Sequence, residues 1–115
     1  MNTGYIGREG EKVAIDYIKS WGYEIIATNY KAAGCEIDII ARKNMHLAFI
    51  EVKTRKDTRF GFASDAVNFT KQQRIIRAAR AFIMNFNDYE DISFDVCEVY
   101  TLERKINYIE NAFEM

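Results

Sequence analysis

The chain has 115 residues, of which 49% are hydrophobic and 14% aromatic, with a formal net charge of −1. This length suits one domain spanning residues 1–115, and the composition excludes an intrinsically disordered protein. No apolar run approaches the ~20 residues that cross a bilayer, and the polar start lacks a signal-peptide core, so we expect a cytoplasmic protein without membrane contact. Cys35 and Cys97 form no metal-binding motif and are expected to be free thiols.

The charges are distributed unevenly along the chain. Residues 1–41 contain four Lys or Arg and six Asp or Glu, a net charge of −2. Residues 42–80 contain ten and three, a net of +7, and residues 81–115 contain two and eight, a net of −6. A basic middle segment would present a positive surface to a polyanion such as DNA. A solvated face of mixed charge explains the same run equally well.

The first predicted element is a helix from Gly7 to Trp21. Ala14, Ile18 and Trp21 recur on one face with helical spacing, and Gly22 stands where such a helix would end. We therefore expect this face to pack on the core.

Three strands are predicted next, at 23–30, 36–41 and 47–54, because apolar residues run between polar turns. The polar turn at residues 42–45 joins the last two strands into a hairpin. If the turn centres on residues 44 and 45, residue i pairs with residue 89 − i. Asp38 then lies opposite Glu51 on one face of the sheet.

Residues 55–69 are predicted to form a loop before a second helix. Thr70 and Gln73 fit a capping box, and the helix that they open continues to about Phe86. Its expected core stripe consists of Ile75, Ala78, Ala79, Phe82 and Phe86. Strands at 93–100 and 105–109 complete the chain. The order of one helix, three strands, one helix and two strands predicts an α/β fold with a mixed sheet.

Asp38 and Glu51 are two acids inside apolar strands, where like charges destabilise each other. A divalent cation, Mg²⁺ or Mn²⁺, would compensate them, because such hard ions prefer carboxylate oxygens. The alternative is a buried ion-pair network in which Lys53 and an arginine neutralise both acids. Lys53 lies two residues beyond Glu51 and projects the same way, so its ammonium can position a water or offset charge on a phosphate.

At these residues the chain resembles the PD-(D/E)xK nuclease superfamily, and within it the YraN-like family of bacterial proteins related to archaeal Holliday-junction resolvases. The pattern that carries the resemblance includes Gly10 and Glu11, the run from Glu36 to Ala41, and the run from Phe49 to Arg55. The resemblance implies a restriction-endonuclease-like αβββαβ core, in which helices flank a mixed sheet. Cys35 departs from the pattern, because a glycine is expected at this position.

The resemblance also implies roles for individual residues. Asp38 and Glu51 would hold the metal, Lys53 would be the lysine of the motif, and Glu11 would be a helix-borne acid near the site. Glu11 lies three residues before Ala14, so it continues the apolar face of the first helix. A favourable acid in the first turn of a helix is the alternative explanation for Glu11.

The basic segment supplies the residues expected to contact phosphates, which are Arg55, Lys56, Arg59, Lys71 and Arg74. Phe60 and Phe62 in the same segment either pack on the core or touch bases. The sequence thus predicts a metal-dependent endonuclease that hydrolyses phosphodiesters in branched or junction DNA. The alternatives are a non-catalytic nucleic-acid-binding module on a nuclease fold and a structural domain with a salt-bridge network. A homodimer is expected by analogy with the resolvases.

Overall fold

The computed structural model describes residues 3–56 and 67–115, and side chains in the first range from Glu9 onward. Two helices and five strands follow one another in the order expected from the sequence. Their bounds are α1 (Thr3–Ser20), β1 (Glu24–Ala32), β2 (Cys35–Lys43), β3 (His46–Arg55), α2 (Phe69–Ile83), β4 (Asp91–Tyr100) and β5 (Lys105–Phe113). The expected contact residue Arg59 and the aromatic residues Phe60 and Phe62 lie outside the described residues.

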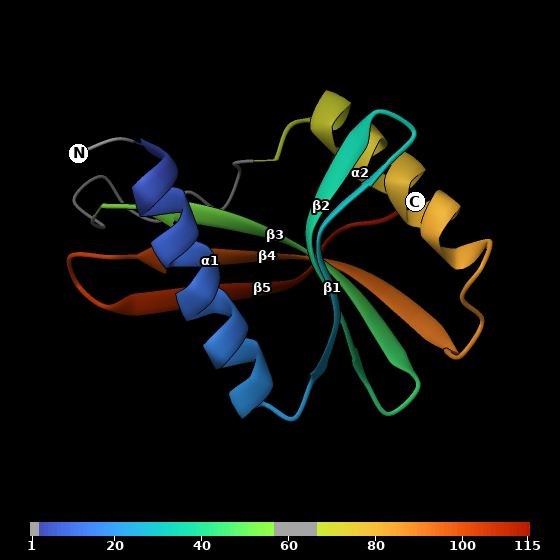
Figure 1. Cartoon of the computed structure of the whole chain (residues 1–115), viewed down its shortest axis with the longest axis horizontal. Helices are drawn as coiled ribbons and strands as arrows, with labels where there is room; N and C mark the ends of the chain where they lie inside the picture. Colours follow the sequence, from blue (N-terminus) through green and yellow to red (C-terminus); the bar gives the residue numbers. More distant parts are fainter. Residues whose placement is uncertain (1–2, 57–66) are drawn as a thin grey trace.

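The five strands form one mixed sheet in the order β1-β2-β3-β4-β5. β3 and β4 are parallel, whereas the other neighbouring pairs are antiparallel. A parallel pair needs a crossover connection, and α2 lies in the connection between β3 and β4 (Figure 1). This architecture confirms the predicted fold class and matches the helix and strand order of a restriction-endonuclease-like core.

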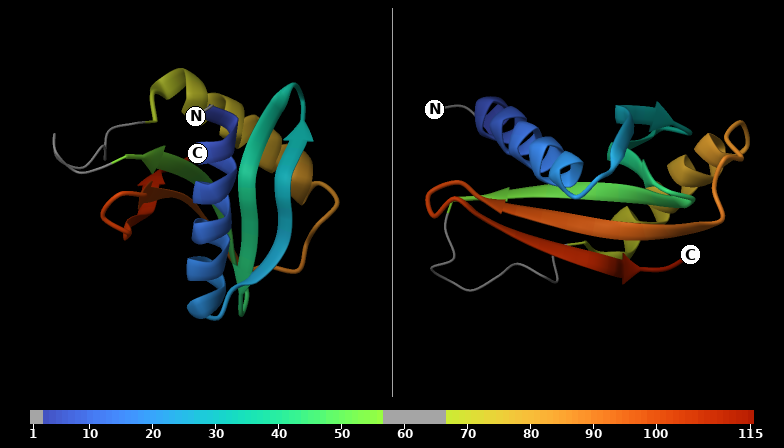
Figure 2. Two further views of the ribbon diagram at one scale, coloured as in Figure 1. Left: turned by 60° about the vertical axis from the view of Figure 1, so that its left-hand side comes forward. Right: turned by 90° about the horizontal axis from the view of Figure 1, so that it is seen from below.

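The two helices cover opposite faces of the sheet (Figure 2). Ala14 and Ile18 of α1 pack in one cluster with Ile39 and Ile50. The other cluster contains strand residues adjacent to these, Ile40 and Phe49. On α2 it contains Ile75, Ile76, Ala78 and Ala79. Because successive side chains of a strand point to opposite faces, this division places α1 on one side and α2 on the other.

α1 ends at Ser20, and this end explains one wrong prediction. Ala14 and Ile18 are buried as expected, but Trp21 is 58% exposed. The helical spacing does not extend to Trp21, because the helix has already ended there. The chain turns at Gly22, which has a φ of 89°, and the N–H of Gly22 donates to the carbonyl of Lys19 at 2.9 Å. The predicted core position of Trp21 is therefore wrong.

The register of the β2–β3 hairpin agrees with the prediction. Ile39 pairs with Ile50, and the pairing continues in steps to Lys43 and His46, so partner numbers sum to 89 throughout. Asn44 adopts a left-handed conformation with a φ of 55°, as the tight turn requires. Asp38 and Glu51 lie one step beyond the first pair, at the open end of the hairpin.

α2 begins two residues earlier than predicted, because its N-cap is Asn68 and not Thr70. The side chain of Asn68 accepts a hydrogen bond from the backbone N–H of Lys71 at 2.8 Å, so Asn68 is the N-cap. The expected capping box of Thr70 and Gln73 is wrong, because Asn68 already occupies the capping position. Both Thr70 and Gln73 are exposed.

The later elements also differ from their predicted bounds. α2 ends at Ile83, yet Phe86 still stacks on Phe82 with ring centroids 5.0 Å apart. β5 continues to Phe113 because a bulge between Phe94 and Val96 lets its pairing with β4 resume beyond the irregularity.

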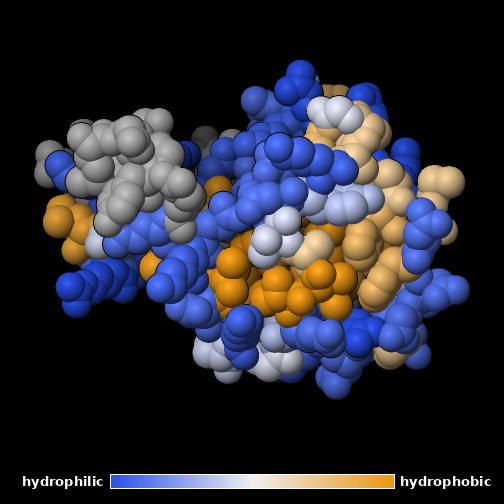
Figure 3. Space-filling view, viewed as in Figure 1, coloured by the Kyte–Doolittle hydropathy of each residue, from blue (hydrophilic) through white to orange (hydrophobic). Residues whose placement is uncertain are grey.

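The face of the molecule seen in Figure 3 is mostly hydrophilic, with hydrophobic atoms gathered between α1 and β1 and beside the C-terminal half of α2. Within the described part of the chain, neither helix has the length and apolar character needed to cross a bilayer.

Candidate functional site

Asp38 and Glu51 lie on the face of the sheet that α2 covers. They have the same strand parity as Ile40 and Phe49, which pack against that helix. Both acids line a pocket of about 440 Å³ between the β1–β2 turn, β3 and the start of α2. The pocket is lined by Gly34, Cys35, Glu36, Asp38, Glu51, Asn68, Thr70, Lys71, Arg74 and Ile75. The structure therefore brings together the two acids that the sequence placed opposite each other.

The carboxyl group of Asp38 is held by the neighbouring strand. Its Oδ2 accepts a hydrogen bond of 2.8 Å from the backbone N–H of Val52 on β3. Burial raises the pKa of Asp38 to about 7, and the charge of Glu51 adds to this effect, whereas the Val52 hydrogen bond opposes it. Near neutral pH the Asp38–Glu51 pair therefore retains a proton for part of the time. Such a perturbed acid in a pocket marks a candidate functional group.

Glu51 is buried and forms an ion pair with α2. Its side chain is 7% exposed, and Oε1 lies 2.5 Å from Nζ of Lys71. Burial alone would lower the pKa of Lys71, but the hydrogen bond and charge of Glu51 outweigh burial and raise it. Lys71, expected to contact phosphates, thus neutralises one of the two acids. The ion-pair network considered as the alternative to a metal is therefore present in part. Lys71 neutralises Glu51, whereas the sequence suggested Lys53 and an arginine for this role.

Lys53 follows on the same face of β3, half-buried beside the acids. Burial lowers the pKa of Lys53, and the positive charge of Lys71 lowers it further. Two ammonium groups that repel each other in this way form a suitable place for an anion.

Glu11 approaches the site from α1. It is half-buried, and its negative charge contributes to the raised pKa of Asp38. Because α1 begins at Thr3, Glu11 lies in the middle of the helix, and the first-turn explanation for an acid there is wrong. Glu11 is not one of the residues that line the pocket.

Three of the other predicted phosphate contacts, Arg55, Lys56 and Arg74, lie among the described residues. Arg55 is the last residue of β3 and Lys56 follows it, and their carbonyls accept hydrogen bonds from the N–H groups of Thr101 and Leu102, respectively. Arg74 is exposed and lines the pocket. Sequence reasoning missed the exposed cations that continue along α2, Arg77 and Arg80, although their spacing of three residues could have revealed them.

Glu98 is a second residue that sequence reasoning missed. It lies beside Lys53 in the parallel register of β3 and β4 and is completely buried. Its Oε1 accepts a hydrogen bond of 2.7 Å from Nδ2 of Asn107, whereas Oε2 has no hydrogen-bond partner among the described residues. The sequence shows that Glu98 is an acid within an apolar strand. That it lies next to Lys53 depends on the order of the strands in the sheet, which the sequence does not show.

The family of the chain follows from its similarity to other proteins. The model of the family described as "Uncharacterised protein family UPF0102" matches residues 10–99. The chain belongs to the UPF0102 family. The matched range contains Glu11, Asp38, Glu51, Lys53 and Glu98, so the whole candidate site lies within the family region.

Several UPF0102 proteins are similar over their full length. A UPF0102 protein of Clostridioides difficile is 44% identical, with 98% of this chain and 100% of the relative covered. A UPF0102 protein of Caldanaerobacter subterraneus is 43% identical, with 98% of each chain covered. One from Caldicellulosiruptor bescii is 42% identical over 98% of this chain and 100% of its own length. The family placement confirms the resemblance to the YraN-like family.

The donor atoms of this UPF0102 site fit a hard divalent cation. Two carboxylates, Asp38 and Glu51, converge on a solvent-accessible pocket, and Mg²⁺ completes its coordination with waters. No group of three or more His, Cys, Asp or Glu side chains suited to a metal occurs within residues 3–56 and 67–115, so a bound ion would keep several waters. Burial, and then the charge of Glu51, raise the pKa of Asp38, so a cation next to Asp38 would favour its charged form.

Proposed function

We propose that this UPF0102 protein is a metal-dependent endonuclease that hydrolyses phosphodiester bonds in structured DNA. The observation that carries the proposal is that Asp38 and Glu51 line one pocket together with the cations Lys71 and Arg74, and that the pKa of Asp38 is raised to about 7. Carboxylates provide the ligands for Mg²⁺ or Mn²⁺, and the cations attract the phosphate backbone.

Each residue has a separate role in this proposal. Asp38 and Glu51 would hold the ion, which activates a water and polarises the phosphate when bound. Lys53 and Lys71 lie beside the acids and would attract the phosphate oxygens as negative charge develops on them. Glu11, on α1, contributes negative charge that favours a cation at Asp38.

The choice of branched or junction DNA comes from the resemblance to the junction resolvases. A four-way junction has two strands to cut at related positions, so we further propose that two copies of the chain act together as a homodimer.

The test is a cleavage assay on linear, flapped, gapped and four-way junction DNA with Mg²⁺ or Mn²⁺. The unmodified protein should cut at least one of these, and Asp38→Asn should lose both Mn²⁺ binding and cleavage. Lys53→Ala should keep its affinity for DNA and metal within a few fold while losing roughly 10²–10³ in rate. Asp16→Asn is the control for Asp38→Asn, because Asp16 is an exposed acid that does not line the pocket.

The ion pair between Lys71 and Glu51 favours a second candidate, a non-catalytic nucleic-acid-binding module. In that case one acid is already neutralised and needs no metal. This candidate becomes the better description if the protein binds several of the DNAs and cuts none with either metal. If it binds neither DNA nor metal, both candidates are wrong.

A further inference from the structure

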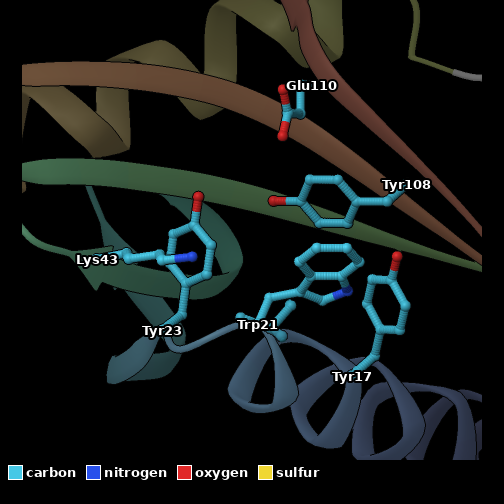
Figure 4. A pocket seen from close by; sticks show the side chains of 7 residues that line it. Tyr17, Trp21, Tyr23, Lys43, Tyr108 and Glu110 are labelled. Carbon is cyan, nitrogen blue, oxygen red and sulfur yellow. The ribbon is translucent and has the colours of Figure 1, made fainter.

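A second pocket lies on the face of the sheet opposite Asp38, beside the C-terminal end of α1 (Figure 4). Its volume is about 420 Å³, within the range of small-molecule sites. It is lined by Tyr17, Ile18, Trp21, Tyr23, Lys43, Tyr108 and Glu110. Four of the seven residues are aromatic, and they come from α1, the turn after it, and β5.

The rings stand on two sides of this aromatic pocket. Tyr17 contacts Trp21 with ring centroids 6.1 Å apart and Tyr108 with centroids 6.2 Å apart. Figure 4 shows these three rings on one side and Tyr23, with the amine of Lys43 beside it, on the other. A planar group that enters the pocket therefore meets aromatic surface on both sides.

Trp21 gives an independent reason to regard this pocket as a binding site. A tryptophan can bury about 150–250 Å² on packing. Here the turn at Gly22 leaves it 58% exposed. Trp21 therefore leaves aromatic surface exposed at the edge of the pocket, where a flat ligand can stack on it.

The polar groups of the pocket restrict the ligand. Nζ of Lys43 lies 5.9 Å from the ring centroid of Tyr23, which leaves a cation at one side, and Glu110 adds an acceptor. Burial and the nearby Asp95 raise the pKa of both Tyr23 and Tyr108, so both rings remain neutral phenols at physiological pH. The hydroxyl of Tyr108 donates to Oδ2 of Asp95 at 2.6 Å, which fixes this ring.

A nucleobase of an unpaired strand satisfies all of these features. Its flat faces stack on aromatic rings, and its edge carries both donors and acceptors. The phosphate next to it offers a partner for Lys43. Lys43 repels an organic cation although Glu110 attracts one, and a purely apolar ligand would leave both Lys43 and Glu110 without a partner.

We propose that the aromatic pocket binds an unpaired base of a DNA strand, between Trp21 and Tyr23, with Lys43 contacting the adjacent phosphate. The proposal rests on the proposed function for its choice of DNA and narrows the substrate to DNA with single-stranded segments. Lys43 lies five residues along β2 from Asp38, roughly 17 Å at the rise of a strand. The pocket thus anchors unpaired DNA at a distance from the acids.

The chain contains a single tryptophan, so its fluorescence reports on this pocket directly. The full-length protein, without metal, is titrated with oligothymidylate, with a duplex of the same length, and with an abasic oligonucleotide of the same backbone. Oligothymidylate should quench Trp21 in a saturable way, whereas the abasic strand and the duplex should quench little. Equal quenching by the abasic strand, or none by any strand, overturns the proposal.

Variants supply the second measurement, by fluorescence polarisation of labelled oligothymidylate. Trp21→Ala and Lys43→Ala should each weaken binding, the former by roughly tenfold or more, because one stacked base is lost. Both side chains are exposed, so the fold is retained, as circular dichroism would verify. Lys19→Ala is the control, an exposed lysine of the same helix that does not line the pocket. Affinity that stays within twofold for Trp21→Ala overturns the proposal.

The two proposals fail in distinguishable ways. If oligothymidylate quenches Asp38→Asn and the unmodified protein equally while no DNA is ever cut, the proposal for the aromatic pocket is supported and the proposed endonuclease activity is wrong. If junction DNA is cut and Trp21 is never quenched, the endonuclease stands and the pocket proposal is wrong.

Discussion

Asp38 makes folding stability depend on pH, and the sign of this dependence follows from its environment. Burial and the charge of Glu51 raise its pKa from the ordinary value of 3.8 to about 7. Between these two pH values the folded protein holds a proton that the unfolded chain has lost. The contribution of Asp38 to stability is therefore complete below about pH 4 and is lost as the pH rises to about 7.

Asp38→Asn should consequently be more stable than the unmodified protein at pH 8, by on the order of 2 kcal/mol, because the side chain at position 38 then carries no charge. The asparagine can still accept the hydrogen bond from Val52. Chemical denaturation in the presence of a chelator, at several pH values from about 4 to 8, measures the difference, which should disappear toward low pH. A constant difference across this range would show that Asp38 does not titrate as described.

Lys71 holds the positive charge next to Glu51 that a metal ion would otherwise provide. Lys71→Met should lower the free energy of unfolding, because it leaves the buried Glu51 carboxylate without its partner. The expected loss is only about 1–2 kcal/mol, because Lys71 is partly exposed and solvent weakens its ion pair. The same change should tighten Mn²⁺ binding several-fold, because competition and repulsion are removed.

Calorimetric titration and chemical denaturation test both effects of the Lys71 change. Arg74→Met is the matched control, since Arg74 lines the same pocket from the next turn of α2 but is exposed. Weaker Mn²⁺ binding by Lys71→Met would mean that Lys71 supports a bound ion instead of competing with it.

At the level of the elements, the sequence predicts the β2–β3 hairpin better than it predicts the ends of the helices. The register of β2 and β3 follows from the sequence. A slip of one residue would turn every side chain of one strand to the opposite face of the sheet, so that Asp38 and Glu51 would no longer share a face. The start of α2 does not follow in the same way. Asn68 and Thr70 are both good capping residues, and only the backbone conformation of Asn68 decides between them.

The packing of α1 on the sheet depends on Gly10. A Cβ at this position would lie 2.1 Å from Oγ1 and 2.9 Å from Cγ2 of Thr54 on β3. Gly10→Ala should therefore destabilise the protein by about 1–3 kcal/mol, although alanine favours a helix by ~1 kcal/mol. Urea denaturation measures the loss, and the double variant with Thr54→Ala should recover most of it. A stabilised Gly10→Ala protein would show that α1 does not approach β3 so closely.

Across the whole molecule, local pairing could be foreseen from the sequence and distant neighbours could not. Asp38 and Glu51 belong to one hairpin, so their opposition follows from a short turn. Lys71 reaches Glu51 through the crossover helix, and Glu98 reaches Lys53 through a parallel pairing of distant strands. The aromatic pocket likewise combines α1, β2 and β5. Residue spacing carries no information about such contacts, because they depend on the order of the strands.

The uneven charge distribution leads to the last prediction. The exposed cations Arg74, Arg77 and Arg80 follow the same helix away from the pocket, and they belong to the segment with a net charge of +7. If DNA lies along α2, each phosphate contact that is lost should reduce the slope of log affinity against log salt by roughly 0.9.

Replacing Arg74, Arg77 and Arg80 by Ala should therefore reduce the magnitude of this slope by roughly 2–3. Fluorescence polarisation with a labelled four-way junction measures the slope. The exposed pair Arg104 and Lys105, at the β4–β5 turn, is the control and should leave the slope unchanged when replaced by Ala. Equal slopes for the α2 variant and the unmodified protein would place the DNA on another face.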